Sequence, residues 1–173
     1  MSKKLVAQTN EVRDECYTPE YAIKPLMDFI GKKIEGKIIW DCAYGTGKLA
    51  KHFNKLGFEV VGEDSLDFLD EDLDCDVIIT NPPYSKKDEF IERCFKIGKP
   101  FALLLPLTAL EGIKRGKIFM ENKIQLIIPN RRINFMIESG KKSCWFTTAW
   151  FCGNMNLEND LNFVILRGKN KAK

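Results

Sequence analysis

The segment Asn81-Pro82-Pro83-Tyr84 combines residue types that could do chemistry, and it directly follows the apolar run from Val77 to Thr80. A single glycine or aspartate would end a buried strand, so two consecutive prolines indicate more than a turn. Proline fixes φ and carries no N–H, so the pair gives a rigid backbone without competing donors. An asparagine oxygen and a proline carbonyl can then serve as fixed acceptors, while the tyrosine ring can stack on a planar group.

A second candidate site is the glycine turn Asp-Cys-Ala-Tyr-Gly-Thr-Gly at 41–47. Gly45 and Gly47 let the backbone approach a ligand closely, and Asp41 can accept hydrogen bonds. The turn has neither the GxxxxGK[ST] phosphate loop nor the full GxGxxG fingerprint. About twenty residues later, Glu63 or Asp64 stands where a carboxylate meets ribose hydroxyls in nucleotide sites. Each feature alone could be a plain turn or a solvated strand end, but together they favour an adenosine-type ligand without a bound pyrophosphate.

These residues must be positioned by an alternation of strands and helices. A strand at 38–41, a helix at 48–56 ended by Gly57 and a strand at 59–62 form a βαβ unit with parallel strands. A helix is expected within 18–30, capped by Thr18, with Pro25 causing a kink or a late start. The remaining expected elements are strands at 76–80, 100–107 and 124–129, helices at 86–98 and 110–122, and β-rich segments at 133–137, 144–153 and 162–167.

The order of these elements predicts an α/β three-layer sandwich with a Rossmann-like, mostly parallel sheet and an antiparallel C-terminal hairpin. In such a sheet the ligand lies beyond the carboxyl ends of the strands, where strand order reverses. The chain has 173 residues, 45% of them hydrophobic and 29% charged. This length and composition predict one self-folding domain spanning 1–173. We expect its ends, 1–14 and 168–173, to be flexible.

The net charge of +3 is too small to indicate nucleic-acid binding by itself, but the charges are unevenly distributed. Acidic residues are dense at 59–76, whereas basic residues gather later in the chain. Lys86 and Lys87 form one basic pair and Arg131 and Arg132 another. The arginine pair belongs either to a solvated turn or to a phosphate contact.

The six cysteines are widely spaced, without a CxxC pair and with His52 as the single histidine. This pattern predicts no metal site, and cysteines inside apolar runs predict buried thiols. The aromatic residues at 145, 146, 150 and 151 are expected to pack in the core or at a sheet edge. No signal peptide and no membrane-spanning apolar run is evident, so we expect a cytoplasmic protein without membrane contact.

Asn81-Pro82-Pro83-Tyr84 resembles the [DNS]-P-P-[YFW] motif of S-adenosylmethionine-dependent methyltransferases that modify amino nitrogens, most typically the N6-adenine DNA methyltransferases. Other segments resemble that family's cofactor motifs in the gamma order: Tyr-Thr-Pro at 17–19, the glycine turn at 41–47, Gly-Glu-Asp at 62–64 and Asp-Phe at 67–68. The segments YTPEYA, GKPFA and RINF are similar to those of small phage-type members. The resemblance covers nearly the whole chain.

The resemblance implies an enzyme that transfers a methyl group from S-adenosylmethionine to adenine N6 in DNA. In the family, the equivalents of Asn81, Pro82, Pro83 and Tyr84 are catalytic. Implied cofactor-binding residues are Tyr17, Thr18 and Pro19 at the methionine end; Asp41, Ala43, Gly45 and Gly47 at its amino-acid group; Asp64, with Glu63 as second choice, at the ribose; Asp67 and Phe68 at the adenine; and Asn81. Lys86, Lys87, Arg131 and Arg132 are candidate nucleic-acid contacts.

Two departures from the family pattern keep alternatives open. Cys42 and Tyr44 replace residues common in the glycine turn, and almost nothing stands for the usual helix and strand between Asp64 and Asp67. We expect no separate target-recognition domain. Recognition therefore comes from loops such as 85–88 and 130–142, or from a homodimer or partner protein. Alternative functions are methylation of an RNA adenine or guanine or of a protein glutamine, or a catalytically degenerate accessory protein that binds cofactor or nucleic acid.

Overall fold

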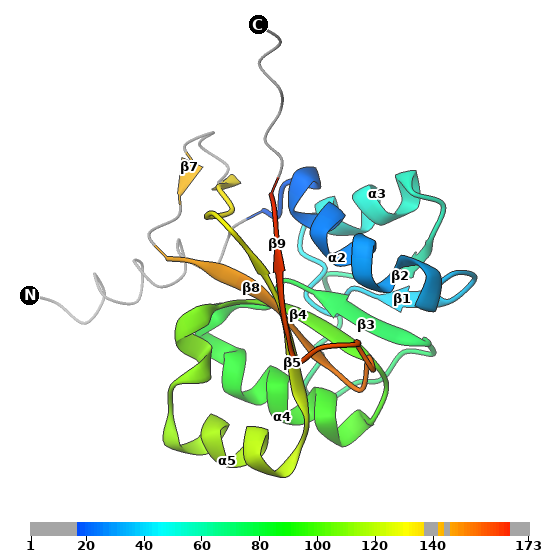
Figure 1. Ribbon diagram of the computed structural model, residues 1–173. Helices are drawn as coiled ribbons and strands as arrows, with labels where there is room; N and C mark the ends of the chain where they lie inside the picture. The colour runs from blue at the N-terminus through cyan, green and yellow to red at the C-terminus, as the bar shows by residue number, and fades with distance from the viewer. Residues whose placement is uncertain (1–16, 137–141, 144–145, 167–173) are drawn as a thin grey trace, which may run out of the picture.

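The computed structural model describes residues 17–136, 142–143 and 146–166, so the predicted flexible ends lie outside the described residues. A seven-stranded sheet with the order β2-β1-β3-β4-β8-β5-β9 forms the centre of the molecule (Figure 1). Its strands are β1 (Ile38–Trp40), β2 (Glu59–Val61), β3 (Val77–Thr80), β4 (Phe101–Pro106), β5 (Ile124–Pro129), β8 (Thr148–Gly153) and β9 (Leu161–Val164). A separate short pair consists of β6 (Phe135–Met136) and β7 (Lys142–Ser143).

The predicted mostly parallel sheet is confirmed. Strands β2, β1, β3 and β4 pair in parallel, as do β5 and β9. The antiparallel pairing expected near the C-terminal end is made by β8, which lies between β4 and β5 and runs antiparallel to both. Strands β4 and β8 are fully buried along their lengths, which explains why both are continuous apolar runs in the sequence.

Helices cover both faces of this sheet and complete the three layers (Figure 1). On one face, α2 (Ile23–Ile30) and α3 (Lys48–Lys55) bury a core that contains Leu26, Phe53 and Trp150. On the other face, α4 (Lys87–Ile97) and α5 (Ile113–Glu121) pack on a second core around Phe101 and Phe151. In the described part of the chain, short 3₁₀ turns connect these elements: η1 (Glu20–Ala22), η2 (Gly31–Lys33), η3 (Tyr84–Lys86) and η4 (Leu107–Leu110).

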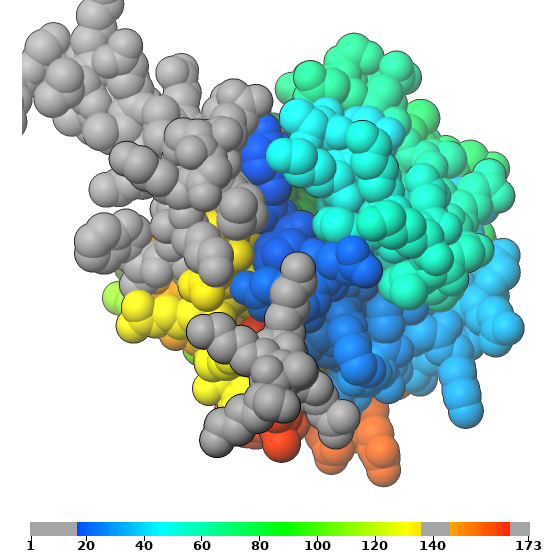
Figure 2. All heavy atoms as spheres, turned by 90° about the horizontal axis from the view of Figure 1, so that it is seen from above, coloured from blue at the N-terminus to red at the C-terminus, as the bar shows by residue number. Residues whose placement is uncertain are grey.

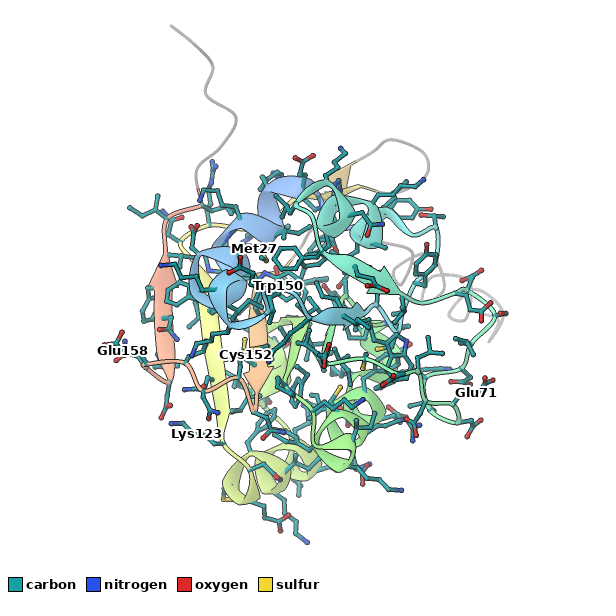
Figure 3. The ribbon with its side chains drawn as sticks, turned by 90° about the vertical axis from the view of Figure 1, so that its right-hand side faces the viewer. Met27, Glu71, Lys123, Trp150, Cys152 and Glu158 are labelled. Atoms are coloured by element: carbon teal, nitrogen blue, oxygen red, sulfur yellow. The ribbon has the colours of Figure 1, made fainter. Side chains whose placement is uncertain are left out.

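Helix α2 starts late, at Ile23. A late start is one of the two effects that the sequence predicted for Pro25. Pro25 is the third residue of α2, where a missing N–H removes no helical hydrogen bond. The predicted Thr18 cap is wrong, because Pro19 occupies the N-cap position of η1 and no side chain caps that turn. Trp150 Nε1 instead fixes η1 to β8 by donating to the Ala22 carbonyl at 3.0 Å, and Trp150 lies beneath α2 (Figure 3).

The first described residues also pack against the βαβ unit. Figure 2 shows the blue segment at the start of the described chain directly beside the cyan segment that contains α3. Lys55 of α3 lies 3.5 Å from the Glu20 carboxylate, and His52 lies 3.7 Å from it. The residues before α2 are thereby held beside α3, the helix that follows the glycine turn.

Strand order reverses between β1 and β3. Strand β1 lies between β2 and β3. The chain passes from β1 to β2 on one side and then crosses to β3 on the other side. Residues 41–47, 62–65 and 81–86 all follow carboxyl ends of these parallel strands and therefore share one edge of the sheet. Within the described part of the chain, no helix is long and apolar enough to cross a membrane.

Candidate functional site

A cavity of about 600 Å³ lies at this edge, at the reversal point of the sheet. Its volume falls within the range of roughly 300–1,000 Å³ that is usual for small-molecule and cofactor sites. The structure brings together there most residues that the sequence singled out. Those that line the cavity are Tyr17, Thr18, Ala43, Gly45, Glu63, Asp64, Asp67, Phe68, Asn81, Pro83 and Lys86.

Other predicted site residues lie beside the cavity without lining it: Pro19, Asp41, Gly47, Pro82, Tyr84 and Lys87. Arg131 and Arg132 are exposed and follow β5, whose carboxyl end shares the sheet edge with β1 and β3. They are thus on the correct edge but separate from the cavity wall.

The glycine turn has the backbone geometry that explains its glycines. Gly45 and Gly47 have φ values of +48° and +67°, in the left-handed region that favours glycine. A Cβ on Gly47 would lie 2.8 Å from the Tyr44 ring. Gly62, at the end of β2, has φ +150°, and a Cβ there would lie 2.4 Å from the Asp41 carbonyl oxygen and 2.8 Å from Tyr44. Tyr44 therefore packs closely against Gly47 and Gly62. Sequence reasoning missed this contact.

Asp41 is buried behind this turn, with only 1% of its surface exposed. Its Oδ1 accepts a hydrogen bond of 2.7 Å from Thr80 Oγ1, and the Ala43 N–H donates to the same hydroxyl oxygen at 3.1 Å. Burial raises the pKa of Asp41 to about 6, although the hydrogen bonds from Thr80 and the Ala43 backbone lower it. Asp41 Oδ2 has no hydrogen-bond partner among the described residues. A buried acceptor of this kind fits a cationic or donor group of a ligand.

The acidic side of the cavity is built from the short connection between β2 and β3. Glu63, Asp64 and Asp67 are exposed, and no helix or strand occurs between Gly62 and Asp76, as the sequence indicated. Figure 3 labels Glu71 in this segment and Glu158 close to β9. The two labels lie on opposite sides of the molecule. The connection thus supplies carboxylates to the cavity without a regular element.

Phe68 anchors this short connection in the core. Its ring lies 5.1 Å from that of Trp40 and 4.7 Å from that of Phe90, which also lines the cavity. Arg93 of α4 lies over the Phe68 ring at 5.5 Å and donates to the Glu71 carbonyl and the Asp72 carboxylate. The floor of the cavity is therefore packed although the usual helix is missing. Phe90 and Arg93 gave only an ordinary helical pattern in the sequence, so sequence reasoning missed them.

The Asn-Pro-Pro-Tyr segment begins directly where β3 ends. Asn81 and Pro83 are half-buried and line the cavity, whereas Pro82 is buried. Tyr84 opens η3, and its ring contacts Phe146 edge to face with centroids 5.4 Å apart. Trp150 and Phe151 are fully buried, as predicted, so Phe146 differs from them by lying next to this segment. Position 145 lies outside the described residues.

One basic side chain of the glycine-turn side also lines the cavity. Lys48, at the first position of α3, lines the cavity and lies 3.2 Å from the ring centroid of Tyr17, close enough for a cation–π contact.

The described cysteines are buried and form no disulfides, and burial raises the pKa of each thiol: Cys42, Cys75, Cys94 and Cys152. Among residues 17–136, 142–143 and 146–166, no group of three or more His, Cys, Asp and Glu could hold a metal ion.

The residues present fit S-adenosylmethionine. Carboxylates at the end of β2 can bind a ribose diol, and left-handed glycines open the turn after β1. The buried Asp41 carboxylate lies behind that turn, where its negative charge favours a cationic group in the adjacent cavity. Together the sheet order, the layers and this cavity define the Rossmann-like architecture of class I methyltransferases.

Solved structures with the same architecture support this assignment of the fold. One is assigned as a class I S-adenosylmethionine-dependent methyltransferase of Listeria monocytogenes, with a TM-score of 0.52 and 15% identity over 88% of this chain and 66% of that chain. Another is assigned as a modification subunit of a type I restriction enzyme from Vibrio vulnificus YJ016, with a TM-score of 0.54 and 13% identity. That match covers 99% of this chain but 51% of the subunit, so the chain spans about half its length. No protein-family model and no curated protein sequence matches the chain.

Proposed function

We propose that the protein is a methyltransferase that uses S-adenosylmethionine to methylate the exocyclic N6 of adenine in DNA. The observation that carries the proposal is the position of Asn81 and Pro83 in the wall of the cavity that also contains the glycine turn and the carboxylates Glu63 and Asp64. A nitrogen-binding segment and an adenosine-binding site thereby share one space. Asn81 follows β3, whereas the glycine turn follows β1. Because the two are separate in the sequence, chance explains their meeting at one cavity less well than a shared function does.

The proposed roles follow from the chemistry of an aromatic amine. Its nitrogen is a poor nucleophile because the lone pair is delocalised into the ring. Asn81 Oδ1 and the Pro82 carbonyl accept the two amine hydrogens, which directs the lone pair away from the ring plane. Tyr84 stacks on the base, a contact worth roughly 1–3 kcal/mol. S-adenosylmethionine, when bound, supplies the electrophilic methyl group. A base in a duplex must leave the stack to reach this segment, at a cost of a few kcal/mol.

Charge around the cavity favours a polyanionic substrate on one side. Glu63, Asp64 and Asp67 would repel phosphates from the β2 side. Lys86 lines the cavity on the side of β3, and Arg131 and Arg132 are exposed farther along the same sheet edge. We infer that the nucleic-acid backbone runs over this basic side. The loops at 85–88 and 130–142 would then contribute to recognition, alone or with a second copy or a partner protein.

Transfer of labelled methyl groups from S-adenosylmethionine tests this function directly. Duplex DNA, single-stranded DNA, RNA and a glutamine-containing protein substrate are offered in parallel to the wild-type chain and to Asn81→Ala. We expect label in DNA for the wild type, and for Asn81→Ala a loss of transfer while cofactor binding is retained. Label confined to RNA or protein would assign the other substrate. Cofactor binding without any transfer would support an accessory protein instead.

A further inference from the structure

Thr80 occupies a position that the proposed chemistry does not use. It is the last residue of β3, immediately before Asn81, and its side chain is fully buried. Its hydroxyl donates to Asp41 Oδ1 at 2.7 Å and accepts from the Ala43 N–H at 3.1 Å. Both bonds cross from β3 to the turn that follows β1, so one hydroxyl joins two points of that turn to the strand that carries Asn81.

We propose that Thr80 is a positioning residue. Its side-chain hydroxyl couples the glycine turn at 41–47 to the Asn-Pro-Pro-Tyr segment at 81–84. The inference rests on the proposed function, because it assigns the turn to cofactor binding. Ala43 and Asn81 both line the cavity, and Thr80, the residue before Asn81, accepts a hydrogen bond from the Ala43 N–H. The hydroxyl thus fixes the spacing between the group that binds the cofactor and the group that holds the amine.

The buried surroundings make this hydroxyl hard to replace. A serine or threonine hydroxyl has one hydrogen to donate, and Thr80 gives it to the Asp41 carboxylate. Valine has nearly the same shape but neither donates nor accepts. In Thr80→Val, Asp41 Oδ1 and the Ala43 N–H would lose this partner, and the buried Asp41 carboxylate has little solvent to replace it. Serine restores the hydroxyl and removes only a methyl group.

The charge of Asp41 gives the coupling a measurable signature. The hydrogen bond from Thr80 lowers the pKa of Asp41 against the larger effect of burial, which leaves it at about 6. Removing the hydroxyl therefore raises this pKa further and reduces the ionised fraction near neutral pH. The adjacent Cys42 thiol interacts electrostatically with Asp41 but stays neutral, because burial raises its pKa well above the usual value. Charged groups that line the same cavity from neighbouring elements are Lys48, Glu63, Asp64, Asp67 and Lys86.

Carboxylate ¹³C NMR on the cofactor-free protein tests the coupling without relying on activity. Asp41→Asn identifies the Asp41 resonance, and Thr80→Val, Thr80→Ala and Thr80→Ser are compared with the wild type. We expect a midpoint near pH 6 in the wild type, an upward shift of about one unit in the valine and alanine variants, and a wild-type midpoint in the serine variant. Two variants without the hydroxyl keep the comparison independent of the folding of either one.

Calorimetric titration with S-adenosylmethionine between pH 5.5 and 8.5 is the second readout. Below the midpoint, affinity should fall, because protonation of Asp41 removes a negative charge that lies behind the turn next to the cavity. The profile of Thr80→Val should move to higher pH by the NMR shift, while Thr80→Ser follows the wild type. Superimposable NMR titrations of the wild type and Thr80→Val would overturn the inference. Absence of cofactor binding by the wild type would instead overturn the proposed function, and the NMR comparison would still decide on Thr80.

Discussion

The rings of Tyr84 and Phe146 meet edge to face, with centroids 5.4 Å apart and planes at 71°. This contact joins the Asn-Pro-Pro-Tyr segment to the residues that lead into β8, although the two are 62 positions apart (146 − 84). Edge-to-face pairs contribute about 0.5–1.5 kcal/mol beyond the area that they bury. Phe146 therefore restricts the orientation of the ring that is proposed to stack on the base.

Phe146→Ala should lower kcat/KM for DNA by roughly two- to tenfold, which corresponds to about 0.5–1.5 kcal/mol. Affinity for S-adenosylmethionine should remain unchanged, because Phe146 does not line the cavity that is proposed to hold the cofactor. Steady-state kinetics and calorimetry measure the two effects separately. Phe146→Tyr, which keeps a ring, is the matched control. Equal losses of cofactor affinity and kcat/KM would show a general loss of structure rather than a loss of ring orientation.

Gly62→Ala should strongly destabilise the protein and weaken cofactor binding. Its φ of +150° is strained for alanine, and the added Cβ would lie 2.4 Å from the Asp41 carbonyl oxygen, so the backbone must shift. We expect a loss of roughly 3 kcal/mol in the free energy of unfolding, measured by urea denaturation. Gly57→Ala is the control, because Gly57 has φ +88° but nothing within 4 Å of the added Cβ. A loss no greater for Gly62→Ala than for this control would contradict the predicted clash.

Asp41 should make the cofactor-free protein less stable as the pH rises. Its folded pKa of about 6 lies above the ordinary value of 3.8, so its stabilising contribution is complete below pH 3.8 and lost as the pH rises through 6. The loss amounts to about 3 kcal/mol at pH 7. Asp41→Asn, which cannot ionise, should therefore gain stability relative to the wild type between pH 4 and pH 7. Urea denaturation at both values checks this, and a constant difference between the two proteins would contradict it.

Arg115 should stabilise the start of α4, the helix that follows the Asn-Pro-Pro-Tyr segment. Its guanidinium donates to the Asp88 carboxylate and to the Glu111 carbonyl, and at 2.7 Å to the Ala109 carbonyl. Arg115→Met should cost roughly 2–3 kcal/mol, because the bonds to the Asp88 carboxylate and the Ala109 carbonyl are partly buried and these acceptors lose their donor. Its neighbour Lys114 pairs with Glu92 on the surface, so Lys114→Met should leave stability close to that of the wild type. Similar urea midpoints for both variants would argue against this role of Arg115.

Arg131 and Arg132, which follow β5, should contribute to the salt dependence of DNA binding. For duplex DNA, each phosphate contact contributes about 0.9 to the slope of log K against log salt concentration. Replacing Arg131 and Arg132 by glutamine should therefore reduce the slope by about 2, as measured by fluorescence anisotropy. Lys32→Gln with Lys37→Gln removes equal charge near the start of β1, at the other edge of the sheet, and is the control. Equal slopes for the two double variants would place the DNA elsewhere.

The sequence predicted the elements of this fold well because their signals are local. Gly57 ends a helix, Pro25 delays one, and the apolar run at 101–106 is a strand buried on both faces. The position of β8 between β4 and β5 depends instead on pairing between distant segments, such as Leu103 with Phe151. No local pattern determines that order.

The candidate site divides in the same way. Asn81, Gly45 and Glu63 belong to segments with recognisable patterns, and the structure gathers them at one cavity. Thr80 was missed because, in the run Val-Ile-Ile-Thr, it looks like one more β-branched strand residue. Its partner Asp41 is 39 positions away. Only the register that pairs Ile39 with Val77 and Trp40 with Ile78 brings the two side chains together.

Binding of S-adenosylmethionine followed by product analysis tests the central claim most directly. The purified chain is titrated with the cofactor by calorimetry, and unmethylated DNA incubated with both is digested to nucleosides and analysed by mass spectrometry. We expect saturable binding by the wild type and N6-methyladenine in the DNA, with no N6-methyladenine formed by Asn81→Ala. Failure of the wild type to bind the cofactor would contradict the proposed methyltransferase function.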